Sequence, residues 1–174
     1  MKVLRKVYMK TDRFEIGDRI KVKFKGETHT ASVVKREADG VLFVLDECLD
    51  ERKQMNANGS NEGGYDKSDL RKYLQQKALE LPEKFRNKLV PFENGDVLRL
   101  IRLAELTGEN TEWDKVCEPL DFFKDRKHRV AYCKEIGDWS WYWLEGAVIN
   151  STHFAYCDHC GHSGHGDASY SLGV

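Results

Sequence analysis

Residues 19–45 decide the fold of the N-terminal part, and they read RIKVKFKGETHTASVVKREADGVLFVL. The stretch opens with an alternation of polar and apolar side chains, the period of two that is typical of a half-buried strand. A segment rich in β-branched residues follows, and then a continuous apolar run that is typical of a strand buried on both faces. The expected strands, separated by glycine-containing turn signals, cover residues 19–24, 28–36 and 41–45. We therefore predict an antiparallel β-meander within residues 1–50.

The middle of the chain, residues 51–145, is predicted to carry two helices. Ser68 precedes apolar residues at helical spacing, and Pro82 stands where the first turn of a second helix leaves its N–H without a partner. The apolar positions of the two helices are Leu70, Tyr73, Leu74 and Ala78, and then Phe85, Leu89 and Val90. Between the meander and the first helix, the Asn-, Ser- and Gly-rich residues 56–64 are expected to be a plain connection.

The overall composition limits the class of protein. The chain has 174 residues, of which 40% are hydrophobic and 33% are charged, and its formal net charge is -1. That is the size of one domain with enough apolar material for a core, so we expect a single domain over residues 1–174. Because there is no basic excess to neutralise phosphates, nucleic acid is not an expected partner. The apolar runs are shorter than the roughly 20 residues that span a bilayer, so membrane insertion is not expected. No apolar core of a signal peptide stands near the start, which predicts cytoplasmic synthesis.

The composition changes at Gly146. From there to Val174 the chain has no Lys, Arg, Glu, Gln, Met, Trp or Pro. Four of the six histidines and two of the five cysteines lie in this segment, and Asp158 and Asp167 are its only acidic residues. We therefore divide the chain into a meander, a helical and scaffold part, and a C-terminal binding region, which cover residues 1–50, 51–145 and 146–174.

Three tryptophans alternate just before this region. Trp139, Trp141 and Trp143 stand two residues apart, so on one strand they would project to the same side. We expect this side to be a buried base under the C-terminal hairpin. An aromatic platform for a ligand is the alternative.

A zinc site is one interpretation of residues 157–165. Cys157 and Cys160 have the C-x-x-C spacing, and His162 and His165 would complete a tetrahedral set of ligands. Against it, Cys2His2 sites separate the two ligand pairs by about a dozen residues, and on a strand the two cysteines would face opposite sides. A small zinc-binding module therefore stays an alternative to a protein without a cofactor. A second alternative is an enzyme that uses one of these cysteines as its nucleophile.

The residue types of residues 156–170 support a different interpretation. This segment uses only Tyr, Cys, Asp, His, Gly, Ser and Ala. All of them are reachable from the asparagine codons AAC and AAT when the two adenines are replaced and the final pyrimidine is kept. Lys, Glu, Gln, Met and Trp are not reachable, because their codons end in a purine. Mutagenesis directed at adenines would leave this alphabet, and Cys157 and Cys160 would then be its by-products.

Several stretches of the chain together resemble one known family. They are WYWL at 141–144, FAY at 154–156, ASYSLGV at 168–174, GGY at 63–65, SDLRKYL at 68–74 and LVPF at 89–92. In this combination, which spans most of the chain, the sequence resembles the variable proteins of diversity-generating retroelements, bacterial and prophage proteins with a C-type-lectin fold. The resemblance implies that a reverse transcriptase rewrites adenine-templated codons in the C-terminal region, and that the fold displays the varied side chains as a ligand-binding surface. Members continue past Leu-Gly-Val with a closing strand, so here we expect that strand to be short or to lie beyond Val174.

These observations predict an α+β protein with a C-type-lectin-like fold, in which an N-terminal antiparallel β-meander and two helices support a C-terminal variable β-hairpin. We expect a ligand-binding display protein encoded by a phage or prophage, and not an enzyme. Its partner would be a protein or another surface ligand, with homo-oligomer formation and virion association left open, and with no cofactor unless the zinc alternative holds. Gly161 and Gly164 are expected to serve turns. The expected contact residues are Tyr156, Cys157, Asp158, His159, Cys160, His162, Ser163, His165, Asp167, Ser169 and Tyr170.

Overall fold

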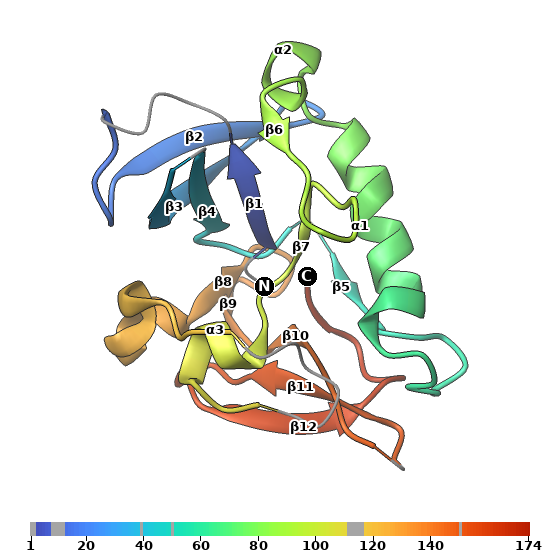
Figure 1. Ribbon diagram of the computed structural model, residues 1–174. Coiled ribbons are helices and arrows are strands. Elements are labelled where there is room, and N and C mark those ends of the chain that lie inside the picture. The colour runs from blue at the N-terminus through green and yellow to red at the C-terminus, as the bar shows by residue number, and fades with distance from the viewer. Residues whose placement is uncertain (1–2, 8–12, 39, 50, 111–116, 150) are drawn as a thin grey trace.

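The computed structural model of the chain describes residues 3–7, 13–38, 40–49, 51–110, 117–149 and 151–174. Within these ranges the protein is α+β, with a few short helices beside two main β-sheets (Figure 1). The helices are α1 (Asp69–Leu79), α2 (Glu83–Arg86) and α3 (Leu103–Thr107), with 3-10 turns η2 (Tyr65–Lys67), η3 (Asp121–Lys124) and η4 (Arg126–Arg129). None of the helices in the described ranges is long and apolar enough to cross a membrane.

The N-terminal sheet contains the predicted meander. Its strands β2 (Arg19–Phe24), β3 (Glu27–Glu37) and β4 (Gly40–Leu45) pair consecutively and antiparallel, which confirms the prediction. Every residue of β4 is buried, as expected for a strand covered on both faces. The sheet continues through β1 (Val3–Val7) to β6 (Leu89–Val90), and β7 (Arg99–Leu100) also pairs with β1. Of the predicted turn at residues 38–40, Asp39 lies outside the described residues.

The two predicted helices are present, but the second is shorter than expected. Ser68 caps α1, since its side-chain oxygen accepts the backbone N–H of Arg71 at 3.0 Å. Pro82 is the residue before α2, which ends at Arg86 after a single turn. The expectation that Leu89 and Val90 extend the apolar side of this helix is wrong, because both form β6 and pair with β1 instead.

The C-terminal sheet has five strands in the order β12-β11-β10-β13-β5. They are β5 (Arg52–Lys53), β10 (Tyr142–Ala147), β11 (His153–Cys157), β12 (Ser163–Asp167) and β13 (Leu172–Gly173). The sheet is mixed, because β13 runs parallel to β10 and antiparallel to β5. The backbone N–H of Leu49 donates to the carbonyl oxygen of Val174, so the last residues are fixed inside the structure. A separate hairpin, β8 (Ala131–Cys133) with β9 (Asp138–Ser140), precedes β10.

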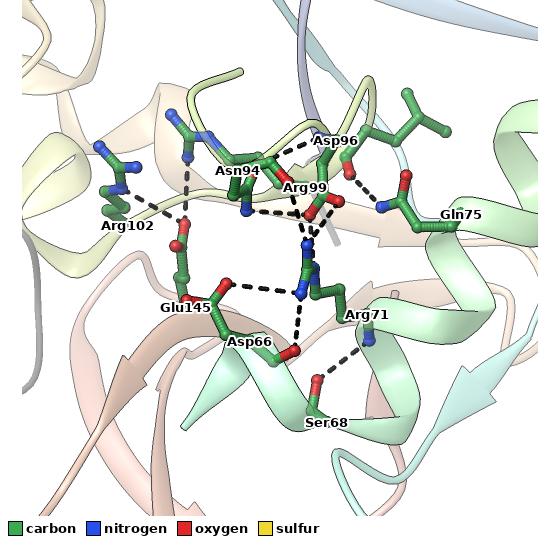
Figure 2. Close-up of polar contacts among 10 residues, drawn as sticks. Asp66, Ser68, Arg71, Gln75, Asn94, Asp96, Arg99, Arg102 and Glu145 are labelled. Atoms are coloured by element: carbon green, nitrogen blue, oxygen red, sulfur yellow. Dashed lines mark hydrogen bonds and ion pairs between the residues drawn. The ribbon is translucent and has the colours of Figure 1, made fainter. Parts of the chain in front are cut away.

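A buried ion-pair cluster connects the two sheets. Arg99 on β7 donates to both carboxylate oxygens of Glu105 on α3, at 2.5 and 2.9 Å. Its Nη1 also lies 3.4 Å from Oε2 of Glu145 on β10, and Nε of Arg102 lies 3.4 Å from the same oxygen (Figure 2). Burial alone would lower the pKa of Arg99, but the two carboxylates raise it above its usual value, so the cation is firmly held. The cluster therefore ties β7 of the N-terminal sheet to β10 of the C-terminal sheet.

A second polar cluster fixes α1 to the chain before β7. The guanidinium of Arg71 makes a two-pronged contact with Asp96, at 2.8 and 3.0 Å, and donates to the carbonyl oxygen of Asp66 at 2.7 Å (Figure 2). One turn further along α1, the side-chain amide of Gln75 donates to the carbonyl oxygen of Leu98 at 3.0 Å. Buried apolar residues of both sheets and of α1 belong to one core cluster. These contacts give the C-terminal sheet a rigid support.

Candidate functional site

The segment with the restricted residue alphabet, residues 156–170, covers the end of β11, the turn and β12 of the β11–β12 hairpin. In its register Phe154 lies opposite Gly166, and Tyr156 lies opposite Gly164. Side chains of paired residues share a face of the sheet, so these four lie on one face. The other face carries three pairs, which are His153 with Asp167, Ala155 with His165, and Cys157 with Ser163.

An aromatic stack stands on the first of these faces. The rings of Trp141 and Tyr156 are stacked, with centroids 4.9 Å apart and planes 13° apart. The indole N–H of Trp141 donates to Nδ1 of His159 at 2.9 Å, and these two rings are within 8° of coplanar. Trp141 nevertheless keeps 40% of its surface exposed. Trp141 and His159 therefore make one flat surface, backed by Tyr156 and open to solvent.

The glycines of β12 make room for this stack. A Cβ built on Gly164 would lie 2.6 Å from Cζ of Tyr156, and one on Gly166 would lie 3.2 Å from Cδ1 of the same ring. The tyrosine ring therefore lies against the bare backbone of β12. The expectation that Gly164 serves a turn is wrong, since it lies within a strand and faces a side chain. Gly161 does serve the turn, with a φ of +83°.

The three alternating tryptophans do not share one buried side. Trp143 is fully buried, and its indole N–H donates to the carbonyl oxygen of Lys53 at 2.9 Å. The expectation of a buried base is wrong for Trp139 and Trp141, which are 52% and 40% exposed. The reason is that β9 ends at Ser140 and β10 begins at Tyr142, in a different sheet. The alternation of side chains between two faces therefore does not continue from β9 into β10. Trp139 instead packs edge-on against Tyr132 of the β8–β9 hairpin.

The turn between β11 and β12 is fixed by Asp158. One carboxylate oxygen of Asp158 accepts the backbone N–H groups of Cys160 at 2.8 Å and His162 at 2.9 Å. Partial burial would raise the pKa of this carboxyl, but the two backbone donors hold it below its usual range. Nε2 of His162 in turn meets the guanidinium of Arg126 on η4 at 2.5 Å. Asp158, predicted to contact a ligand, thus has a structural role in the turn.

Asp167 has a similar structural role at the other end of β12. Its carboxylate accepts the hydroxyl of Thr152 at 2.6 Å, and both the hydroxyl and the backbone N–H of Ser169, at 2.6 and 2.9 Å. The hydrogen bonds from Ser169 and then Thr152 lower the pKa of Asp167 to about 2. Asp167 and Ser169 therefore join the two ends of the hairpin.

The pKa of Asp167 makes the hairpin sensitive to acid. A carboxylate with a depressed pKa stabilises the fold fully above its unfolded pKa of about 3.9, and the contribution is lost as the pH falls towards 2. We expect Asp167→Asn to lower the melting temperature at pH 6, with the difference from the unchanged protein shrinking as the pH falls below about 4. Thermal unfolding followed across pH 2–7 measures this. A difference that stays constant over that range would contradict the role of the ionised carboxylate.

The remaining predicted contact residues divide by exposure. Cys157 was expected at the ligand surface, and this is wrong, because the residue is fully buried and its sulfur lies 3.5 Å from the carbonyl oxygen of Arg129. The 3-10 turn η4 covers it. Exposed are His159, Cys160, His162, His165 and Tyr170, and partly exposed are Tyr156 and Ser163.

The zinc alternative needs four ligands that the hairpin separates. Cys157 is buried on β11, while Cys160 is exposed on the turn. His162 contacts Arg126, and His165 stands on β12 opposite Ala155. Among the described residues, which include all four candidates, no group of three or more His, Cys, Asp or Glu side chains is placed to hold a metal ion.

Two further features of the structure were not foreseen from the sequence. The loop 56–64 is more than a connection, because the side-chain amide of Asn61 donates to the carbonyl oxygens of Val148 and His153, at 2.6 and 3.1 Å. It thereby anchors the base of the hairpin. Away from the hairpin, a cavity of about 320 Å³ lies beside Arg99, Arg102 and Glu105.

Comparison of the chain with protein-family models, with curated proteins and with solved structures finds no match.

Proposed function

We propose that this is a ligand-binding display protein of the C-type-lectin type, encoded by a phage or prophage, whose β11–β12 hairpin carries side chains varied by a diversity-generating retroelement. The observation that carries the proposal is that a segment with an unusual composition in the sequence also forms a continuous part of one hairpin. The residues with the restricted alphabet, 156–170, cover the end of β11, the turn and β12. Of their exposed members, His159 forms the flat surface with Trp141, Cys160 and His162 lie in the same turn, and His165 lies on the other face of the hairpin. The partner would be a protein or another surface ligand, and binding would need neither catalysis nor a cofactor.

The residues of the ion-pair cluster that supports the sheets are separate in the sequence from the exposed residues of the hairpin, and this separation favours the proposed function. The buried ion-pair cluster that connects the two sheets, Arg99, Glu105 and Glu145, precedes the segment with the restricted alphabet. Exposed loops and turns on a rigid scaffold can change without unfolding the core, which is the arrangement used by many binding proteins. A surface of this kind tolerates variation at exposed positions and gives new contacts with each variant.

The chemistry of the surface suits recognition of varied partners. Tyr156, His159 and Tyr170 are rigid and have few rotatable bonds, so they lose little conformational entropy on binding. The flat Trp141–His159 pair offers apolar area, and the exposed His162 in the same turn adds a polar ring. Such a mixture of aromatic anchors and adaptable polar groups is typical of binding loops.

A matched pair of libraries tests the proposal. In the first, His159, Cys160, His162, His165 and Tyr170 are randomised; in the second, five exposed positions of the N-terminal sheet are randomised. The control positions are Arg19, Lys21, Lys23, Lys25 and Thr28. We expect folded binders against several unrelated target proteins from the hairpin library and few from the control. No enrichment from the hairpin library, or equal enrichment from both, would contradict the proposal.

Metal content distinguishes the display function from the zinc-binding module. Protein purified without a histidine tag should contain no stoichiometric zinc if the hairpin acts as a display surface. Stoichiometric zinc that is lost in Cys160→Ser would replace the proposal with the zinc module. An enzyme that uses Cys160 would instead show an activity that the same variant abolishes.

A further inference from the structure

Two histidines in the turn between β11 and β12 contact groups that can only donate hydrogen bonds. The indole N–H of Trp141 donates to Nδ1 of His159 at 2.9 Å. Nη1 of Arg126 lies 2.5 Å from Nε2 of His162. An indole nitrogen and a guanidinium carry N–H donors and no acceptor. Each histidine therefore offers a lone pair at the nitrogen that makes the contact.

These two contacts fix the protonation state of both rings. A neutral imidazole has one N–H and one lone pair, whereas a protonated imidazole has two N–H groups and no lone pair. Both rings are therefore neutral in this arrangement, with the proton on Nε2 in His159 and on Nδ1 in His162. Nδ1 of His162 lies 3.5 Å from Oδ2 of Asp158, so that proton faces a carboxylate. The planes of Trp141 and His159 differ by only 8°, which suits a lone pair that lies in the ring plane.

The ionisable groups around the turn and Trp141 come from several elements. The 3-10 turn η4 lies against Gly161, because a Cβ there would be 2.7 Å from Cγ of Arg126. On the other side, the hydroxyl of Ser163 donates to Glu109 at 3.1 Å. The groups are Asp158 and Cys160 in the turn, Asp125, Arg126, Lys127, His128 and Arg129 at η4, Glu109 after α3, Asp138 on β9 and Tyr156 on β11.

Of these residue types, histidine is the one whose charge ordinarily changes between pH 5 and 8. Partial burial would raise the pKa of Asp158, but the backbone N–H groups of His162 and Cys160 hold it below its usual range, so this carboxylate stays charged. The ring of His128 contacts the carbonyl oxygen of Phe122 through Nδ1 at 2.8 Å, a contact that a protonated ring also makes. Protonation therefore breaks contacts at the two rings of the turn and not at η4.

We propose that this turn is a pH-sensitive element, in which neutral His159 and His162 hold the flat surface at Trp141 together and acid releases it. A protonated His159 sets its own N–H against the indole N–H of Trp141, so the bond is lost and the two rings are no longer held in one plane. A protonated His162 sets a second cation and a second N–H against Arg126, so the turn separates from η4. Each ring gains one proton from solvent.

For ligand binding, this inference rests on the proposed function, whereas the pH response of the surface itself does not. A ligand that uses the flat Trp141–His159 surface binds at neutral pH and leaves in acid. Trp141 and Arg126 precede the segment with the restricted alphabet, and positions 159 and 162 lie within it. The donors are thus constant, and the response belongs to variants with histidine at these two positions.

An NMR titration of the unliganded chain from pH 8 to pH 5 tests the element. The indole N–H of Trp143 is the internal control, because it donates to the carbonyl oxygen of Lys53, which does not titrate. We expect the Trp141 indole resonance to move and that of Trp143 to stay. At pH 8 the ring nitrogen signals should place the lone pair on Nδ1 of His159 and on Nε2 of His162. A Trp141 resonance that moves no more than that of Trp143, or a proton on Nδ1 of His159 at pH 8, would overturn the proposal.

Two asparagine variants identify the ring that responds. His159→Asn places a carbonyl oxygen on Cγ, where the histidine carries Nδ1, and this acceptor does not titrate. We expect the Trp141 resonance of this variant to be independent of pH. His165→Asn is the matched control, because His165 is also exposed but lies on the other face of the hairpin, and it should keep the full response. A response that persists in His159→Asn, or that is lost in His165→Asn, would overturn the proposal.

Binding measurements separate failure of this element from failure of the proposed function. A library that keeps His159 and His162 and randomises Cys160, His165 and Tyr170 is selected against a target protein at pH 8, and binders weakened by Trp141→Ala are retained. We expect their affinity to fall at least tenfold at pH 5, because fewer molecules keep the surface intact, and the fall to be absent after His159→Asn. Equal affinity at both pH values would overturn the pH element. If the library gives no binder, the proposed function fails, and the NMR titration alone decides the pH response.

Discussion

Replacing Arg99 with methionine should lower the free energy of unfolding by about 3–5 kcal/mol. The side chain of Arg99 is 3% exposed, and it is the cation shared by Glu105, at 2.5 Å, and Glu145, at 3.4 Å. Methionine fills a similar volume, so the loss of stability comes from the carboxylates of Glu105 and Glu145, which stay buried without the cation that they share. Because the cluster joins β7, α3 and β10, the variant should also loosen the support of the C-terminal sheet. Urea unfolding of both proteins measures the difference.

The matched control for this prediction is an exposed arginine in a single ion pair. Arg19 lies 3.4 Å from Asp46, and its side chain is 71% exposed. Arg19→Met should change the free energy of unfolding by no more than about 1 kcal/mol. Equal effects of the two substitutions would show that Arg99 does not connect the two sheets in the way described.

The second large effect concerns the packing of Tyr156 on β12. Gly164→Val should destabilise the protein by about 1–3 kcal/mol, because its Cβ would lie 2.6 Å from the tyrosine ring and force that ring away. The displaced ring would no longer back Trp141. We expect the indole N–H resonance of Trp141 to shift and its exchange with solvent to accelerate as the bond to His159 weakens. Urea unfolding and NMR of the indole groups measure the two effects.

A double-mutant cycle separates this clash from a general cost of changing β12. In a Tyr156→Ala background the ring is absent, and valine is then a good strand residue, so Gly164→Val should be neutral or stabilising. The expected coupling between the two positions is about 0.5–3 kcal/mol. An equal cost of Gly164→Val in both backgrounds would contradict the packing. If the coupling is found, positions 156 and 164 of a diversified hairpin do not vary independently.

Strand prediction succeeded where local pattern and tertiary environment agreed. In β2 the apolar residues Val22 and Phe24 alternate with exposed lysines, and β4 is an unbroken apolar run. The strands and the side chains that they bury could therefore be predicted from the sequence pattern alone. α1 was predictable for the same reason, with Ser68 as its cap. α2 was overestimated because Leu89 and Val90 continue a helical spacing, although β1 offers them strand partners from the far end of the chain.

The candidate site was predictable as a segment but not residue by residue. Residue types located the hairpin, because a restricted alphabet is visible without any structure. Burial of Cys157 was not predictable, since it depends on η4, a remote 3-10 turn that covers one face. The structural roles of Asp158 and Asp167 depend on backbone and hydroxyl donors that only the folded turn brings together. The role of Gly164 depends on a ring from the neighbouring strand.

Sequencing the DNA that flanks the coding sequence tests most directly whether the C-terminal surface is diversified. We predict an imperfect repeat of the part that encodes residues 146–174, differing from it only where the template carries adenine, beside a gene for a reverse transcriptase. The differences should include codons of exposed hairpin residues such as His159, His162 and His165. Absence of any such repeat and of a reverse transcriptase would contradict the diversified surface.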